Sequence, residues 1–120
     1  MTTEEISFPE RVFQLWGYTV GMGRLLLRST KSPTYSTRID VLIQNVQFVK
    51  MPAYLEGLAI RVANESERMM VEVEVGALPS GDVKCFVVSG SSYTGYVIAG
   101  ALKTYEDEGS YSDPSPLLTW

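Results

Sequence analysis

Residues 16–40 bring together aromatic and arginine side chains, which dominate protein-binding hot spots because they bury a large area and keep a polar group. Alternate side chains of a strand point to opposite faces, so Arg24, Leu26 and Arg28 would share one face. That face would be basic and partly apolar, which suits an acidic partner. The predicted partner-binding residues are Trp16, Tyr18, Arg24, Arg28, Arg38 and Asp40.

The same residues also have a purely structural interpretation. Arg28 and Arg38 would then pair with acids on neighbouring strands, and Trp16 would fill the core, as most aromatic residues do. Glu72 and Glu74 are a second choice for a partner contact, because a predicted strand would place both on its outer face. Both interpretations stay open at the level of the sequence.

The chain offers few groups for covalent or acid–base catalysis. It has no histidine and one cysteine, and histidine is the residue whose ordinary pKa lies nearest neutrality. Cys85 lies in the apolar run of residues 83–88, where cysteine usually acts as a small buried hydrophobic residue. The acids of residues 106–108 lack the ligand spacing of a calcium loop. We therefore predict no catalytic residue, no metal site and no cofactor.

The length and the composition predict the architecture that must position these side chains. The chain has 120 residues, of which 45% are hydrophobic and 20% charged, as in an ordinary single globular domain. Seven to eight short strands with frequent turns predict a mainly β fold, either an antiparallel β-sandwich or a small open barrel. We assign residues 1–105 to this β-rich domain and 106–120 to an irregular acidic, proline-containing tail. That tail either folds back on the domain or exposes its apolar end.

One short N-terminal helix is predicted before the strands begin. Ser7, Pro9 and Glu10 have the spacing of a helix start, which favours a helix over residues 8–16. Beyond it, Gly21–Gly23 is typical of a hairpin link or a bulged bend between two strands.

The clearest strand alternation lies in residues 69–75, with valines and a methionine on one face and glutamates on the other. Residues 64–67 before it are predicted to form a polar turn. A turn at 79–82 and a strand at 83–89 would complete a hairpin with this segment.

The charges are unevenly distributed. Residues 1–50 carry six basic and four acidic groups, and residues 51–120 carry four basic and ten acidic groups, for a net charge of −4. An acidic protein is a poor general nucleic-acid binder, since a basic surface supplies most of that affinity. Separate basic and acidic faces favour oriented docking on another protein.

The apolar residues are not arranged for export or membrane insertion. No apolar run is long enough to span a bilayer, and the first residues do not form a secretory signal. We therefore predict a cytoplasmic protein with no membrane partner. A homodimer formed through a free strand edge or through residues 117–120 is compatible with this prediction.

Three segments, residues 13–29, 37–52 and 55–62, carry a resemblance to a known group. Their sequences, FQLWGYTVGMGRLLLRS, TRIDVLIQNVQFVKMP and LEGLAIRV, resemble those of small bacterial all-β proteins, including immunity proteins of toxin systems. The resemblance implies a cytoplasmic protein that binds another protein, such as a toxin. Members of such groups often carry a histidine–aspartate pair near the first strand. Here Gly21–Gly23 stands there, so no catalytic residue is carried over.

Three functional hypotheses follow. The first is a non-catalytic protein-binding module of immunity type that docks through the arginine and aromatic face. The second is a small-molecule-binding β-barrel carrier, which requires an apolar cavity of roughly 300 Å³ or more with a few polar groups. The third is a carboxylate-based hydrolase, which requires two acids in a cleft, one of them with a raised pKa.

Overall fold

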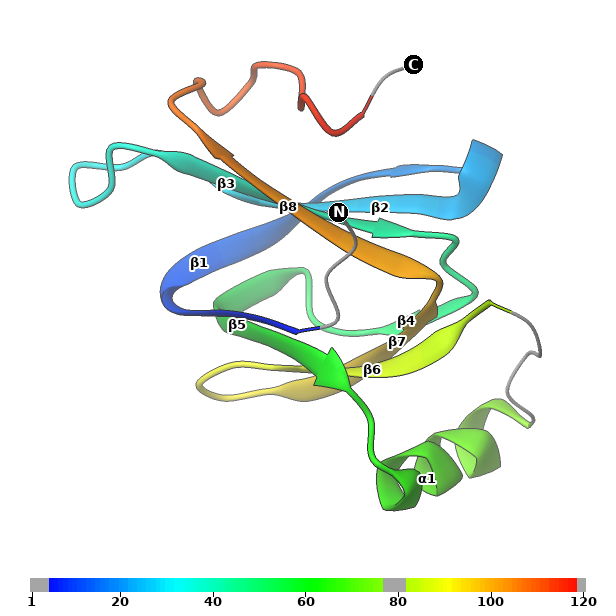
Figure 1. Ribbon diagram of the computed structural model, residues 1–120. Coiled ribbons are helices and arrows are strands. Elements are labelled where there is room, and N and C mark those ends of the chain that lie inside the picture. Colours follow the sequence, from blue (N-terminus) through cyan, green and yellow to red (C-terminus); the bar gives the residue numbers. More distant parts are fainter. Residues whose placement is uncertain (1–4, 77–81, 119–120) are drawn as a thin grey trace.

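The computed structural model describes residues 5–76 and 82–118, which form a mainly β fold (Figure 1). This confirms the predicted fold class. In the described part of the chain there are eight antiparallel strands, a 3-10 turn, η1, at Gly21–Gly23, and one α-helix, α1, at Glu65–Val75. The strands are β1 (Ile6–Thr19), β2 (Arg24–Ser29), β3 (Arg38–Gln44), β4 (Phe48–Lys50), β5 (Tyr54–Val62), β6 (Lys84–Ser89), β7 (Thr94–Ala99) and β8 (Ala101–Asp107).

The strand order is β4-β7-β6-β5-β1-β2-β3-β8. Each end of this order is linked along the chain to the opposite end, because β3 runs into β4 and β7 runs into β8. Residues 45–47 alone separate β3 from β4, and Gly100 alone separates β7 from β8. β3 pairs with β8 and β4 pairs with β7. The Gly100 N–H bonds to the Gln44 carbonyl at 2.8 Å, and the Gln47 N–H bonds to the Ile98 carbonyl at 2.7 Å. The sheet therefore closes on itself as a small barrel.

The barrel interior is filled by one face of each strand. Alternation sends Leu25 and Leu27 of β2 inward and leaves Leu26 and Arg28 on the outer face. The predicted alternation of this segment is therefore confirmed. The buried interior consists of Ile6, Phe13, Leu25, Leu27, Ile39, Val41, Ile43, Leu55, Leu58, Ile60, Phe86, Val88, Val97, Ala99 and Leu102.

The helix predicted over residues 8–16 is wrong, because this segment belongs to β1. The pairing of β1 with β5 shifts register between Phe8 and Val12. Pro9, which cannot donate to a ladder, lies in this irregularity rather than in the first turn of a helix. Gly21–Gly23 does link β1 to β2 as a hairpin, as predicted.

The strand predicted over residues 69–75 is also wrong, because this segment is the main part of α1. The Asn64 side chain accepts from the Glu67 N–H at 2.8 Å, and the Glu67 carboxylate accepts from the Asn64 N–H at 2.9 Å. This reciprocal capping box begins the helix where a polar turn was predicted. β6 consequently pairs with β5 and β7, and residues 79–81 of the predicted turn lie outside the described residues.

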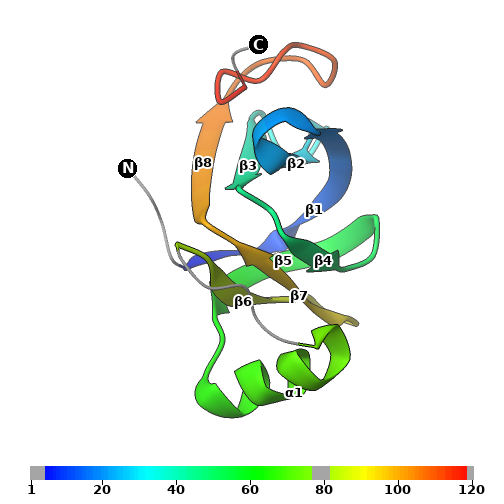
Figure 2. The same cartoon turned by 90° about the vertical axis from the view of Figure 1, so that its right-hand side faces the viewer.

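Two outer faces of the barrel are covered. Residues 108–118, which we call the C-terminal segment, leave β8 and run across β2 and β3, while α1 lies at the opposite side (Figures 1 and 2). The segment forms neither helix nor strand, although β8 itself continues to Asp107, beyond the predicted boundary at residue 105. Under α1 lies a second apolar cluster that includes Ala63, Val71, Cys85, Val87 and Ile98.

Candidate functional site: an arginine and aromatic surface

Arg28 lies on the outer face of β2, directly opposite Asp40 of β3. Its guanidinium donates to both carboxylate oxygens of Asp40, through Nε at 2.7 Å and Nη2 at 3.1 Å. Each side chain is only 1% exposed. The barrel register therefore produces a buried bidentate ion pair.

Arg38 forms the second pair, with Asp107, which faces it across β3 and β8. Nε and Nη2 of Arg38 donate to the two carboxylate oxygens at 3.0 Å and 2.8 Å. The Arg38 guanidinium holds the pKa of the Asp107 carboxyl below its usual range, and the same hydrogen bond raises the pKa of Arg38. Two neighbouring cations are thus each balanced by one anion.

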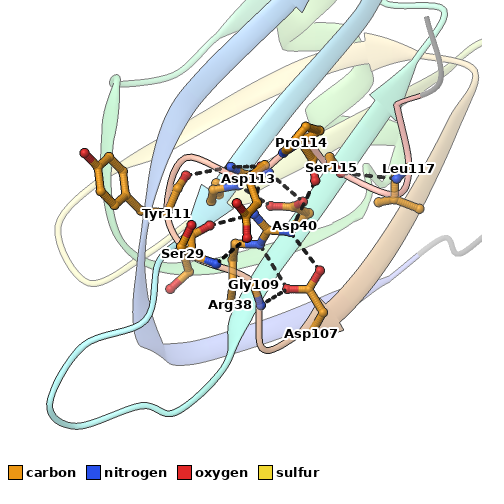
Figure 3. A network of polar contacts seen from close by, with 12 residues as sticks. Ser29, Arg38, Asp40, Asp107, Gly109, Tyr111, Asp113, Pro114, Ser115 and Leu117 are labelled. Carbon is orange, nitrogen blue, oxygen red and sulfur yellow. Dashed lines mark hydrogen bonds and ion pairs between the residues drawn. The ribbon is translucent and has the colours of Figure 1, made fainter.

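Both arginines also bind the backbone of the C-terminal segment, and Figure 3 shows Arg38 within this network. Nη1 of Arg28 donates to the carbonyls of Tyr111 at 2.7 Å and Asp113 at 2.9 Å. Nη1 of Arg38 donates to the carbonyls of Ser110 and Asp113, each at 2.8 Å. One carbonyl, that of Asp113, therefore accepts from both guanidinium groups. We call the outer face of β2, β3 and β8 around these two side chains the arginine surface.

Gly109 lets the segment turn closely over Arg38. A Cβ atom at this position would lie 2.7 Å from Nη2 and 2.8 Å from Cζ of Arg38. The Gly109 N–H also donates to the Asp107 carboxylate at 3.0 Å. A side chain at this position would therefore displace the Arg38 guanidinium from its present contacts.

The aromatic side chains lie beside Arg28. Trp16 occupies an irregularity in the pairing of β1 with β2, and its ring lies 5.1 Å from the Arg28 guanidinium. Tyr111 of the C-terminal segment meets Trp16 edge to face, with 6.4 Å between ring centroids. A groove of about 240 Å³ lies here, and its lining includes Trp16, Tyr18, Leu26, Arg28 and Leu118.

The structure thus brings most of the predicted partner-binding residues together, although it exposes few of them. Trp16 and Tyr18 are 37% and 54% exposed. Arg28, Arg38 and Asp40 are buried under the C-terminal segment and in the two ion pairs, and not exposed on the outer face as expected. Their part in partner binding stays a prediction.

The structural interpretation was correct for the pairing of Arg28 and Arg38 with acids on neighbouring strands. It was wrong for Trp16, which lies outside the barrel core. Arg24 lies at the start of β2, where its Nε donates to the Thr19 hydroxyl at 3.3 Å.

Sequence reasoning missed the residues that complete this surface from far along the chain, because Asp107, Gly109 and Tyr111 were assigned to the tail or to its boundary. It also did not single out Arg11, a buried residue outside this surface whose Nη2 donates to the Thr37 carbonyl at 2.7 Å. The signal for Asp107 was the strand register, which only the closed sheet defines.

A second groove, of about 340 Å³, lies between α1 and β7, and its lining includes Met70, Val71, Val87 and Tyr96. At its polar end Lys50 binds Glu74 at 2.8 Å, and the Tyr96 hydroxyl donates to Glu74 at 2.6 Å. Burial, assisted by Glu74, raises the pKa of Tyr96 to about 12. Lys50 and Tyr96 in turn lower the pKa of Glu74. The structure places Glu74 on α1, and not on the outer face of a strand as predicted.

The catalytic hypothesis finds no support in the described residues. Burial raises the pKa of the Cys85 thiol, which disfavours the reactive thiolate. The described carboxyl groups with a clearly shifted pKa, Glu67, Glu74, Asp107 and Asp113, all shift downward, Glu67 to about 2. A general acid would need the opposite shift.

Comparisons with known proteins leave the function to be argued from the geometry. Within residues 5–76 and 82–118, no helix has the length and apolar character needed to cross a bilayer. No protein-family model, curated protein or solved structure matches the chain.

Proposed function

We propose that this protein is a non-catalytic binding module that docks on another protein through the β1–β2 hairpin and the adjoining aromatic groove. The observation that carries the proposal is the exposure of large side chains along this hairpin. Tyr18 is 54% exposed, Val20 88% and Met22 75%. Apolar side chains held in water gain nothing for the fold, and clustered examples mark interaction sites.

The backbone of the hairpin tip supports the same proposal. Met22 has φ of 70°, in the left-handed region, where a side chain costs about 1 kcal/mol or more relative to ordinary conformations. Such strain concentrates at functional positions. Here it holds an apolar side chain in solvent between two glycines.

The ion pairs change the expected chemistry of the partner. Arg28 and Arg38 are neutralised by Asp40 and Asp107, so the surface offers aromatic and apolar contacts rather than positive charge. The complementary surface on the partner is therefore expected to be apolar. The resemblance to immunity proteins makes a toxin the first class of partner to test, and the unpaired Cys85 suits a reducing compartment such as the cytoplasm.

Site-specific photocrosslinking in cells of the source organism tests the proposal. A photoreactive amino acid at Tyr18 should yield a crosslinked protein partner, whereas the same group at Met70, exposed on α1, should not. With the purified partner, Tyr18→Glu should weaken binding at least tenfold and Met70→Glu less than twofold. Equal effects of the two variants, or crosslinks only between copies of this chain, would contradict the proposal.

The groove beside α1 favours a second candidate function, the binding of a small apolar molecule. Its volume of about 340 Å³ and its apolar walls with a polar end fit a small-ligand site. A fragment library screened by methyl NMR should shift Val71 and Val87 before any methyl of the barrel interior. Shifts spread evenly over the protein would remove this candidate.

A further inference from the structure

We infer that the arginine surface is a docking site for a peptide segment that forms a tight turn, and that the chain's own C-terminal segment occupies it as an internal ligand that a partner's segment replaces. This inference rests on the proposed function, since the incoming segment belongs to the bound protein. It adds a second contact, on β2, β3 and β8, to the hairpin contact.

The two arginines bind the C-terminal segment through its backbone carbonyls, and the Asp113 carboxylate supports the turn by accepting from the Ser110 N–H at 2.9 Å. The carbonyls of Ser110, Tyr111 and Asp113 accept from the Nη1 atoms of the two arginines. A turn brings these carbonyls together, because the Asp113 N–H donates to the Ser110 carbonyl at 3.2 Å. A segment that forms the same turn could accept the same bonds. Recognition through backbone groups, with a few pockets for side chains, is a common mode of peptide binding.

Beyond the arginines, Lys31 donates to the Glu108 carbonyl at 2.9 Å and Trp16 packs against Tyr111. The segment joins no strand ladder, and in its described part Ser115 alone is buried. Segments with few buried apolar contacts open at low free-energy cost. The arginines, in contrast, need an occupant, because the Nη1 atoms of Arg28 and Arg38 have their described acceptors on this segment. Exchange of one segment for another would keep these donors satisfied.

The charges and the groove define the chemistry of the replacing segment. Each arginine already has a carboxylate partner, so the surface selects backbone carbonyls rather than an anionic peptide. An aromatic residue in the position of Tyr111 would meet Trp16, and an apolar residue in the position of Leu118 would enter the groove. A proline, as at Pro114, fixes its own backbone φ angle and so reduces the entropy that the segment loses on binding.

Peptide exchange on the full chain tests the inference. The probe is a fluorescent peptide with the sequence of residues 108–118, and its binding is followed by fluorescence polarisation. Gly109→Ala places a Cβ against Arg38 and should loosen the internal segment, so that the probe binds this variant at least tenfold more tightly than the unaltered chain. Val73→Ala, on the exposed side of α1 and away from the segment, is the control and should bind as the unaltered chain does.

The arginines must carry this binding. Adding Arg38→Lys to Gly109→Ala keeps the charge and removes the planar double contact, and should weaken probe binding at least tenfold while circular dichroism shows the fold retained. Equal binding by Gly109→Ala and the unaltered chain, or binding insensitive to Arg38→Lys, would overturn the inference. In that case, loss of partner binding in Tyr18→Glu would still support the proposed function. If the probe binds Gly109→Ala through Arg38 but Tyr18→Glu leaves partner binding unchanged, the hairpin contact of the proposed function fails and the peptide site remains.

Discussion

The C-terminal segment and helix α1 both cover an outer face of the barrel, but different interactions hold them. The segment is bound by arginine side chains to its backbone carbonyls and buries little of itself. Helix α1 inserts Val71 into an apolar cluster and is bordered by exposed ion pairs, Arg61–Glu67 and Lys50–Glu74. One cover depends on directional bonds, and the other depends chiefly on apolar burial.

This difference separates what each face can do. Apolar burial has no direction and tolerates sliding or a small ligand beside the helix, as the adjoining groove suggests. Charge-assisted bonds require exact positions, so the arginine surface can distinguish one backbone path from another. The same bonds make the arginine surface more sensitive to single substitutions.

The largest effect is expected at the buried pair of the arginine surface. Arg28→Met leaves Asp40 charged and unpaired, which should lower the free energy of unfolding by about 3–5 kcal/mol. Urea denaturation followed by circular dichroism measures it. The double variant Arg28→Met with Asp40→Leu should recover most of this loss, and Arg28→Lys should lose less than the methionine variant. A loss below about 1 kcal/mol in Arg28→Met would break the comparison.

On the other face the expected loss is smaller and arises from packing. Val71→Ala removes two buried methyl groups and should cost roughly 2 kcal/mol of unfolding free energy in the same assay. Val73→Ala, on the exposed side of α1, is the matched control and should change stability by less than about 0.5 kcal/mol. Similar losses in the two variants would show that α1 is not held by burial of Val71.

The helix cap should contribute less again. Asn64→Ala removes the side chain that accepts from the Glu67 N–H, which should cost about 1 kcal/mol. Hydrogen exchange should rise first in the amides of the first turn of α1. Ser66→Ala, in the same turn, serves as control, and equal exchange in both variants would argue against the capping box.

The smallest expected effect is on pH dependence at the arginine surface. Arg38 lowers the pKa of Asp107 from its ordinary value of 3.8, so the pair's contribution to stability is fully present above that value. It is lost as the pH falls through the lower pKa of the folded state. A carboxyl-carbon NMR titration should show this depressed pKa, and Arg38→Lys should move it upward. An unchanged Asp107 pKa in the variant would contradict the ion-pair origin.

Local pattern predicted much of this fold because alternation along a strand needs only the chain itself. The inward Leu25 and Leu27, the hairpin at Gly21–Gly23 and the buried Cys85 were all predicted correctly. Two predictions failed. Residues 8–16 have an apolar spacing that fits both helix and strand, whereas residues 69–75 alternate as a strand does and yet form a helix. In the first segment Pro9 lies at an irregularity of strand β1, and in the second a capping box begins helix α1.

The candidate site was predicted only in part, for a different reason. The sequence by itself determined a mainly β chain that contains the aromatic and arginine residues of the surface, because composition and alternation are local properties. Only the tertiary structure decided that Arg28 and Arg38 are buried, since the residues that cover them lie some 70 or more positions away. Burial is a property of what folds over a face, and the closed sheet brings Asp107 and the segment behind it to that face.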